Sequence, residues 1–279
     1  MDRKLKERSK KRNIVRRVLG GFMALIWISI SLGVLHRSLQ SPIERHPDSS
    51  IEDREWESKS YGYAPHPKSH REPVIQVYAA RTWGVKNALA VHTWIATKRQ
   101  GASAYKVDQI IGWRLRRTGS SLVSDYRVPD QSWWGKEPVL LLDKRGPEVE
   151  ALIDKVERAI DSYPYNAEYT VWPGPNSNTF TAWIGLEVPE LGLDLPSTAI
   201  GKDWRPLEQT VGYSPSGTGV QASLYGLAGA SLGYEEGLEI NVLGLNVELD
   251  LFDLAIELPG LGRIGTEPVN SDLYTRIIP

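Results

Sequence analysis

The polar stretch at residues 174–180, which reads Gly-Pro-Asn-Ser-Asn-Thr-Phe, holds the residue types best suited to chemistry. It follows a run of β-forming residues at 169–172. After it, apolar residues recur at helical spacing until Pro189, and these are Phe180, Trp183, Ile184 and Val188. We therefore expect a helix that begins near Ser177. Free backbone N–H groups and the helix dipole at that end would stabilise a negative charge on the Ser177 oxygen.

A second interpretation of this stretch remains open. Asn and Ser after a Gly-Pro turn are ordinary helix caps, so Asn176, Ser177 and Asn178 could serve only to begin the helix. Thr179 adds a second hydroxyl one helical step further on. The sequence therefore predicts either a nucleophile or a cap at Ser177.

His92 is the only histidine in the predicted core, and it lies in a β-like run at residues 88–97. Alternation along this run places His92 and Trp94 on one face of the strand and Thr93 on the other. A histidine in this setting is either a hydrogen-bonded core residue or a catalytic base.

A metal centre is not expected. The other four histidines lie in or beside a polar stretch without ligand spacing, and the chain has no cysteine; they are His36, His46, His66 and His70. We expect no cofactor either. The formal net charge of -1 gives no overall bias towards nucleic acid, so no nucleic-acid partner is expected. Ten tryptophans and twelve tyrosines against three phenylalanines suit a membrane or a sugar partner.

The elements that position these residues can be read from hydrophobic patterns. Three β-like runs at residues 74–78, 88–97 and 108–117 should pair as neighbouring strands. A continuous apolar run at 138–142 predicts a buried strand, and Trp133-Trp134 before it predicts an exposed aromatic loop. After Gly146-Pro147, one apolar stripe at helical spacing predicts a core helix: Val149, Leu152, Ile153, Val156 and Ile160.

The N-terminal part has the pattern of an uncleaved membrane anchor. Residues 1–17 are strongly basic, and residues 18–35 contain no charge. We expect a cytoplasmic tail, one transmembrane helix at 18–35 and an extended linker at 36–73. A cleaved signal peptide and a basic arm for nucleic acid are the weaker alternatives. A bacterial inner membrane, with the C-terminal domain in the periplasm, is the natural setting, so this membrane is the first expected partner.

Beyond an irregular loop at residues 191–204, the chain becomes rich in glycine and leucine. Short alternating segments at 221–225, 238–243, 246–251 and 254–258 predict antiparallel hairpins. Their apolar residues could cover the core domain or contact lipid. Since no amphipathic helix argues for lipid, we expect them to pack on the core.

Two features of the sequence together resemble a known family. A histidine on an early strand, followed by an Asn-nucleophile-x-x-Phe motif at a helix start, resembles the circularly permuted papain-like proteins, including the lecithin:retinol acyltransferase type. Their motif reads Asn-Cys-x-x-Phe, and Asn176-Ser177-Asn178-Thr179-Phe180 matches it with serine in place of cysteine. A serine hydroxyl needs a well-placed general base, whereas a thiol needs only a lowered pKa, so the chemistry does not transfer directly.

This resemblance implies roles for individual residues. Ser177 would be the nucleophile and His92 the base. The group that orients the base would be Asp108 or Gln109, which lie on opposite faces of the next strand, and the choice stays open. Asn176 or Asn178 would either donate to an oxyanion or cap the helix.

The soluble part is also similar to a bacterial family known only as domain of unknown function 3750, whose members are typically membrane-anchored proteins of proteobacteria. The similarity runs over about residues 74–265. It is carried by the stretches 92–96, 111–113, 174–179, 198–203 and 214–219. It implies a family but no activity.

We therefore expect an α+β fold, in which residues 74–205 form an antiparallel sheet with packed helices of the permuted papain-like type. Residues 206–279 should form a Gly-rich β-hairpin extension. Two functions remain open. One is serine-dependent acyl transfer or hydrolysis of an amide or ester in the cell envelope. The other is a non-catalytic binding or scaffold protein for a lipid, peptide or glycan, in which Trp94, Trp113, Trp133, Trp134 and Trp172 matter more than Ser177.

Overall fold

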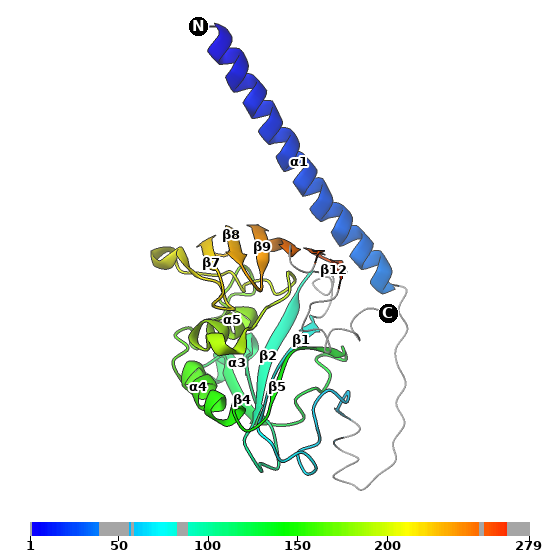
Figure 1. Ribbon diagram of the computed structural model, residues 1–279, viewed down its shortest axis with the longest axis vertical. Helices are drawn as coiled ribbons and strands as arrows, with labels where there is room; N and C mark the ends of the chain where they lie inside the picture. The colour runs from blue at the N-terminus through cyan, green and yellow to red at the C-terminus, as the bar shows by residue number, and fades with distance from the viewer. Residues whose placement is uncertain (1, 39–55, 57–58, 83–88, 251–253, 267–279) are drawn as a thin grey trace.

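The computed structural model describes residues 2–38, 56, 59–82, 89–250 and 254–266. Helices combine with two antiparallel sheets, which confirms the predicted α+β class (Figure 1). One sheet has five strands and the other has seven, and both carry the antiparallel pairing throughout.

The five-stranded sheet has the order β4-β3-β2-β1-β5. Its strands are β1 (Val74–Arg81), β2 (Val91–Lys98), β3 (Lys106–Ile110), β4 (Leu122–Tyr126) and β5 (Pro138–Arg145). The predicted strands at 74–78 and 138–142 are therefore confirmed, and the run at 88–97 is confirmed from Val91 onward, with residue 88 outside the described residues. β1 and β2 are buried along almost their whole length because both of their faces are covered.

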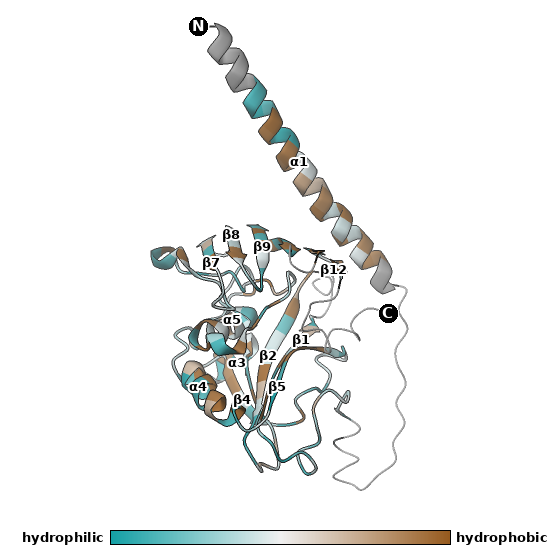
Figure 2. Ribbon diagram, viewed as in Figure 1, coloured by the Kyte–Doolittle hydropathy of each residue, from teal (hydrophilic) through white to brown (hydrophobic). Residues whose placement is uncertain are grey.

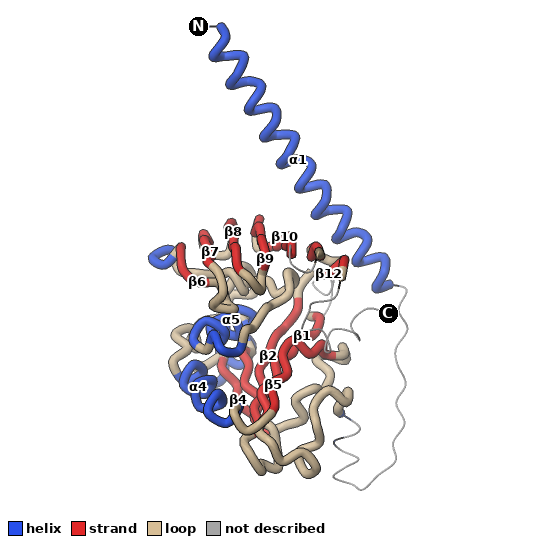
Figure 3. The backbone as a smooth tube through the Cα atoms, in the orientation of Figure 1, coloured by secondary structure: helices blue, strands red, loops and turns tan. Residues whose placement is uncertain are grey.

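Two helices cover one face of this sheet, namely α4 (Val149–Asp161) and α5 (Ser177–Glu187) (Figure 3). The predicted stripe on α4 is confirmed, since Ile153 and Val156 are fully buried in the main core. Phe180 and Ile184 of α5 enter the same core. The helix starts of both elements follow the sequence signals closely.

Two predicted strand segments are wrong. Residues 112–117 of the third run form a short helix, α3 (Gly112–Thr118), which ends at Gly119 in the left-handed conformation. Leu115 and the arginines of this segment are good helix formers, and their alternation imitates a strand. The β-forming run at 169–172 is irregular. It precedes Pro173 and Pro175, which cannot donate to a strand ladder.

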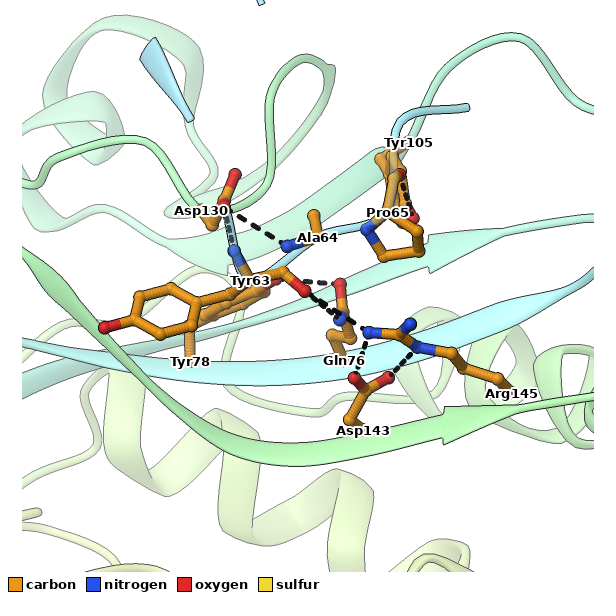
Figure 4. Close-up of polar contacts among 9 residues, drawn as sticks. All are labelled: Tyr63, Ala64, Pro65, Gln76, Tyr78, Tyr105, Asp130, Asp143 and Arg145. Atoms are coloured by element: carbon orange, nitrogen blue, oxygen red, sulfur yellow. Dashed lines mark hydrogen bonds and ion pairs between the residues drawn. The ribbon is translucent and has the colours of Figure 1, made fainter. Parts of the chain in front are cut away.

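The opposite face of the sheet is covered by residues 60–65, part of the stretch predicted as a linker (Figure 4). The Asp130 carboxylate accepts hydrogen bonds from the backbone N–H groups of Tyr63 and Ala64 at 2.9 and 3.2 Å. Gln76 Nε2 donates to the Tyr63 carbonyl at 3.3 Å. Because Asp130 and Gln76 are buried, these bonds fix the segment to the domain instead of leaving it extended in solvent.

The seven-stranded sheet is a meander in which each strand pairs with its sequence neighbours, so the predicted hairpins are confirmed. Its strands are β6 (Val211–Tyr213), β7 (Val220–Leu224), β8 (Ala228–Gly233), β9 (Gly237–Val242), β10 (Leu245–Asp250), β11 (Ala255–Leu258) and β12 (Gly262–Gly265). Two short 3₁₀ helices precede it, η2 (Pro189–Leu191) and η3 (Leu207–Gln209).

The two faces of this sheet differ in polarity, and the apolar one turns away from the protein body. The strand register aligns one apolar row across the sheet: Tyr213, Val220, Leu232, Leu238, Leu249, Ile256 and Ile264. The neighbouring row on the other face is polar: Gln221, Ser231, Glu239, Glu248, Glu257 and Arg263. We call the apolar side the outer face. The expectation that these apolar residues pack on the core domain is wrong, because most of them are exposed while the polar row is buried.

The polar row is paired inside the protein. Lys202 forms an ion pair with Glu239 at 2.5 Å. Asp203 accepts hydrogen bonds from Gln221 and Asn241 at 2.6 and 3.0 Å. These side chains join the sheet to the loop that follows α5, so polar contacts take the place that an apolar core would usually fill.

The N-terminal helix α1 (Asp2–Ser38) leaves the body beside β12 (Figure 1). Within it, Lys10–Leu35 is long and apolar enough to cross a membrane, and Figure 2 shows the apolar stretch in brown. Ile26 packs with Val247 and Leu258 of the seven-stranded sheet. The Ser29 hydroxyl donates to the Pro259 carbonyl at 2.7 Å.

Candidate functional site

The N-terminus of α5 is closed by Asn176. Its side-chain oxygen accepts hydrogen bonds from the N–H groups of Asn178 and Thr179 at 2.9 and 3.3 Å. In return, Thr179 Oγ1 accepts from the Asn176 N–H at 3.1 Å. This is a capping box, so the N–H groups of Asn176, Asn178 and Thr179 are already paired within the helix start.

Asn178 fastens α5 to its surroundings. Its side-chain Nδ2 donates to the carbonyls of Val91 and Ile200 at 3.1 and 2.8 Å, and its Oδ1 accepts from Thr93 at 3.0 Å. Both donors and the acceptor of this buried amide are thus engaged within the protein. Asn178 holds the helix against β2 and is not available to stabilise a reacting group.

Ser177 is the first residue of α5, as predicted. Its side chain has 4% of its surface exposed, and its hydroxyl makes no hydrogen bond within the described part of the chain. The residue that faces it from β2 is Thr93, whose hydroxyl donates towards the Ser177 carbonyl at 3.2 Å. A threonine hydroxyl cannot remove a proton from serine at neutral pH.

His92 lies on the other face of β2. Strand alternation places it opposite to Thr93, and its ring stacks on Trp133 with centroids 3.9 Å apart. The helix that carries Ser177 contacts Thr93 on the other face of β2, and no hydrogen bond joins Ser177 to His92 within the described part of the chain, so their pairing stays a prediction. The alternation was visible in the sequence, but the face that α5 covers was not.

Gln109 is the partner of His92. The His92 Nε2 lies 2.9 Å from Gln109 Oε1, and with the amide in this orientation the imidazole donates through Nε2–H. Between the two candidates for an orienting group, the structure selects Gln109. Asp108 points to the opposite face, where the Ser124 hydroxyl donates to it and Lys106 lies 3.7 Å away. Burial raises the pKa of Asp108.

His92 is neutral at pH 7. Burial, together with the nearby positive charge of Arg127, lowers its pKa from 6.5 to about 4, although the hydrogen bond to Gln109 acts in the opposite direction. A base with so low a pKa accepts a proton weakly at neutral pH. The imidazole is therefore suited to hydrogen bonding and stacking.

Three tryptophans next to His92 form what we call the aromatic array: Trp113, Trp133 and Trp134. Trp113 stacks on Trp133 with centroids 5.9 Å apart and meets Trp134 edge-on at the same distance. Trp113 and Trp134 are 57% and 60% exposed, so large ring faces are open to solvent. The predicted exposed loop at Trp133-Trp134 is confirmed.

The other predicted tryptophans contribute less. Trp94 is 1% exposed and donates to the Pro129 carbonyl at 2.8 Å, so it is a core residue that no ligand touches. Trp172 is half exposed but lies by the C-terminal sheet, where its Nε1 donates to the Leu243 carbonyl at 3.0 Å. No sequence pattern pointed to Arg127, because its position near His92 depends on how the strands of the sheet pair.

Comparison with known proteins identifies a domain of this chain. Residues 72–204 match the model of a family described as "Protein of unknown function (DUF3750)". No curated protein and no solved structure matches the chain. The matched region includes the five-stranded sheet, α3 to α5, the aromatic array and Ser177, and it ends before β6. The similarity expected over residues 74–265 therefore extends only to residue 204.

Proposed function

The chain belongs through residues 72–204 to the DUF3750 family of proteins of unknown function, and on this premise we propose that it is a membrane-anchored protein that binds a glycan of the cell envelope. The aromatic array carries this proposal. A cluster of exposed tryptophan rings on a protein surface marks a site where a ligand or partner covers the ring faces. Two of the three rings are mostly exposed, and the third is supported from beneath by His92.

The chemistry of a sugar ring fits this arrangement. One side of a pyranose presents C–H groups that pack on the face of an indole ring, while its hydroxyl groups need hydrogen-bond partners at the rim. Trp113 and Trp134 meet at an interplanar angle of 73°, so they form a corner and not a flat platform.

Binding explains the geometry better than acyl transfer does. A serine nucleophile needs a base within hydrogen-bonding distance, and the N–H groups around it must be free for an oxyanion. The Ser177 carbonyl accepts from the hydroxyls of Thr93 and Thr181 at 3.2 and 3.1 Å, and Asn176 already caps the helix. The cleft-forming helix of a permuted papain-like fold would thus be retained here without its nucleophile. The packing of the α5 N-terminus on the second strand supports this view of the fold.

The anchor gives the proposed location. Basic residues precede the apolar part of α1, and positively charged flanks remain on the cytoplasmic side. The domain that follows would then stand in the periplasm of a bacterial cell, held at the outer surface of the inner membrane. Envelope glycans are accessible on that side.

Calorimetry tests the proposal with the full chain reconstituted in lipid nanodiscs and soluble oligomers of N-acetylglucosamine as the probe. Trp113→Ala and Trp134→Ala should each weaken binding about tenfold, which corresponds to a loss of about 1.4 kcal/mol of stacking energy. Tyr126→Ala is the matched control, because Tyr126 is an exposed aromatic residue on β4. Sugar binding that is equally strong in all three variants, or no sugar binding at all, would contradict the proposal.

A further inference from the structure

The outer face of the seven-stranded sheet has the polarity of a surface that contacts lipid. Strands of a sheet packed on a protein body normally turn apolar residues inward and polar residues to solvent. Here every outward position from β6 to β12 is apolar, glycine or tyrosine, with no charge among them. Apolar-out and polar-in alternation is the pattern of strands that face a bilayer.

Most of this face is uncovered within the described part of the chain. Val220, Leu224 and Leu232 are each 58% exposed, and they lie on the adjacent strands β7 and β8. A contiguous apolar surface of this kind marks a contact with another protein or with a membrane. The remaining question is which partner covers it.

One end of the sheet is covered by α1, and this contact indicates which partner covers the rest of the outer face. Ile26 of α1 packs on Val247 and Leu258, which are outward residues of β10 and β11. The same face therefore continues directly from the candidate membrane helix to the exposed strands. If α1 crosses a bilayer, the surface that continues from it must meet the same bilayer.

The depth of this contact supports the argument. Ile26 lies about 14 Å along the helix axis from Leu35, the end of the apolar run. This is about half of the 30 Å hydrocarbon layer. The β10–β12 end of the sheet then lies within one leaflet, where the Ser29 hydroxyl satisfies the turn carbonyl of Pro259.

Tyrosines at the sheet margin agree with this placement. Tyr213 and Tyr234 are 71% and 64% exposed, on β6 and in the turn between β8 and β9. Rings with an apolar body and a polar tip are enriched where a membrane meets water.

We propose that the outer face lies in the leaflet of the membrane that α1 crosses, on the side where α1 emerges, so that the protein contacts lipid through both α1 and β6–β11. The DUF3750 domain is then held at a fixed height above the bilayer instead of moving freely on a linker. The polar row of the sheet stays buried inside the protein, away from the lipid.

Site-specific labelling tests this inference. Because the chain has no cysteine, a thiol-reactive label attaches only to the cysteine that is introduced. The full chain carrying Leu224→Cys or Leu232→Cys is labelled with bimane and reconstituted, one copy per disc, in nanodiscs of phosphatidylethanolamine and phosphatidylglycerol. The control is Tyr126→Cys, which is 77% exposed on β4 of the other sheet. Doxyl-labelled lipids should quench the bimane at 224 and 232 at least threefold more strongly than at 126.

Equal quenching at all three positions in correctly folded protein would overturn the inference. Shielding of position 232 that appears only in discs with two copies would also overturn it, because a second copy would then cover the face. Near-UV circular dichroism shows whether a labelled variant is still folded. If the label at 224 or 232 unfolds the sheet, quenching is measured instead with Val220→Cys on β7.

Discussion

Asn178→Ala should destabilise the DUF3750 domain far more than the neighbouring Ser177→Ala. The Asn178 side chain makes three hydrogen bonds that join α5 to β2 and to the loop at Ile200. Alanine removes all three, while the Ile200 carbonyl keeps only its hydrogen bond from Asn176 Nδ2 at 3.0 Å. The Ser177 hydroxyl makes no hydrogen bond in the described part of the chain, so its removal breaks nothing.

The magnitude follows from these bonds. Each of the three buried hydrogen bonds contributes about 1 kcal/mol, so Asn178→Ala should lower the free energy of unfolding by about 3 kcal/mol. For a domain of this size, that corresponds to a fall in the melting temperature of about 10 °C. Ser177→Ala should change the free energy by less than about 0.5 kcal/mol.

Thermal unfolding of the full chain in detergent, followed by near-UV circular dichroism of the tryptophans, measures both variants. A large effect of Ser177→Ala, equal to that of Asn178→Ala, would refute the conclusion that Asn178 and not Ser177 makes the contacts at this helix end.

Three further predictions concern buried charges and the covering segment. The pKa of His92 falls from 6.5 to about 4 on folding, so between these pH values the unfolded state binds more protons than the folded state. The free energy of unfolding therefore decreases as the pH falls, by about 2 kcal/mol at pH 5. Unfolding midpoints at pH 5 and 7.5 should show this loss in the native chain and not in His92→Phe. Glu239 has the opposite sign, since burial raises its pKa from 4.5 to about 7 against the effect of Lys202. Stability from its protonated form is lost as the pH rises from 4.5 through 7, and Glu239→Gln should flatten that part of the pH profile. Asp130→Ala removes the acceptor for Ser60, Tyr63 and Ala64 and should speed chymotrypsin cleavage at Tyr63 at least tenfold, whereas Asp125→Ala, on exposed β4, should leave the rate unchanged.

The spacing of apolar residues predicted the helices and strands well because it reflects which side of each element is buried. The stripe on α4 and the continuous apolar run of β5 each require one buried side, whatever the rest of the chain does. The start of α5 was predictable from the Asn cap and the polar turn before it. Segment 112–117 failed because alternation over so few residues does not distinguish a strand from a helix.

The arrangement of the candidate site depends on packing that the sequence does not show. Alternation correctly separated His92 from Thr93, but only the packed structure shows that α5 covers the Thr93 face. The choice between Asp108 and Gln109 depended on the same information. In the same way, the alternation of the C-terminal strands predicted an amphipathic sheet, but not that its polar face turns inward to Lys202 and Asp203.

Paired-cysteine cross-linking tests the central claim, which is that Thr93 and not His92 faces the N-terminal turn of α5. Thr93 Oγ1 lies 2.9 Å from Thr181 Oγ1. In an otherwise cysteine-free chain, Thr93→Cys with Thr181→Cys should form a disulfide on mild oxidation. His92→Cys with Ser177→Cys should remain reduced under the same conditions. A disulfide in the second pair and none in the first would contradict the account, because His92 would then face Ser177.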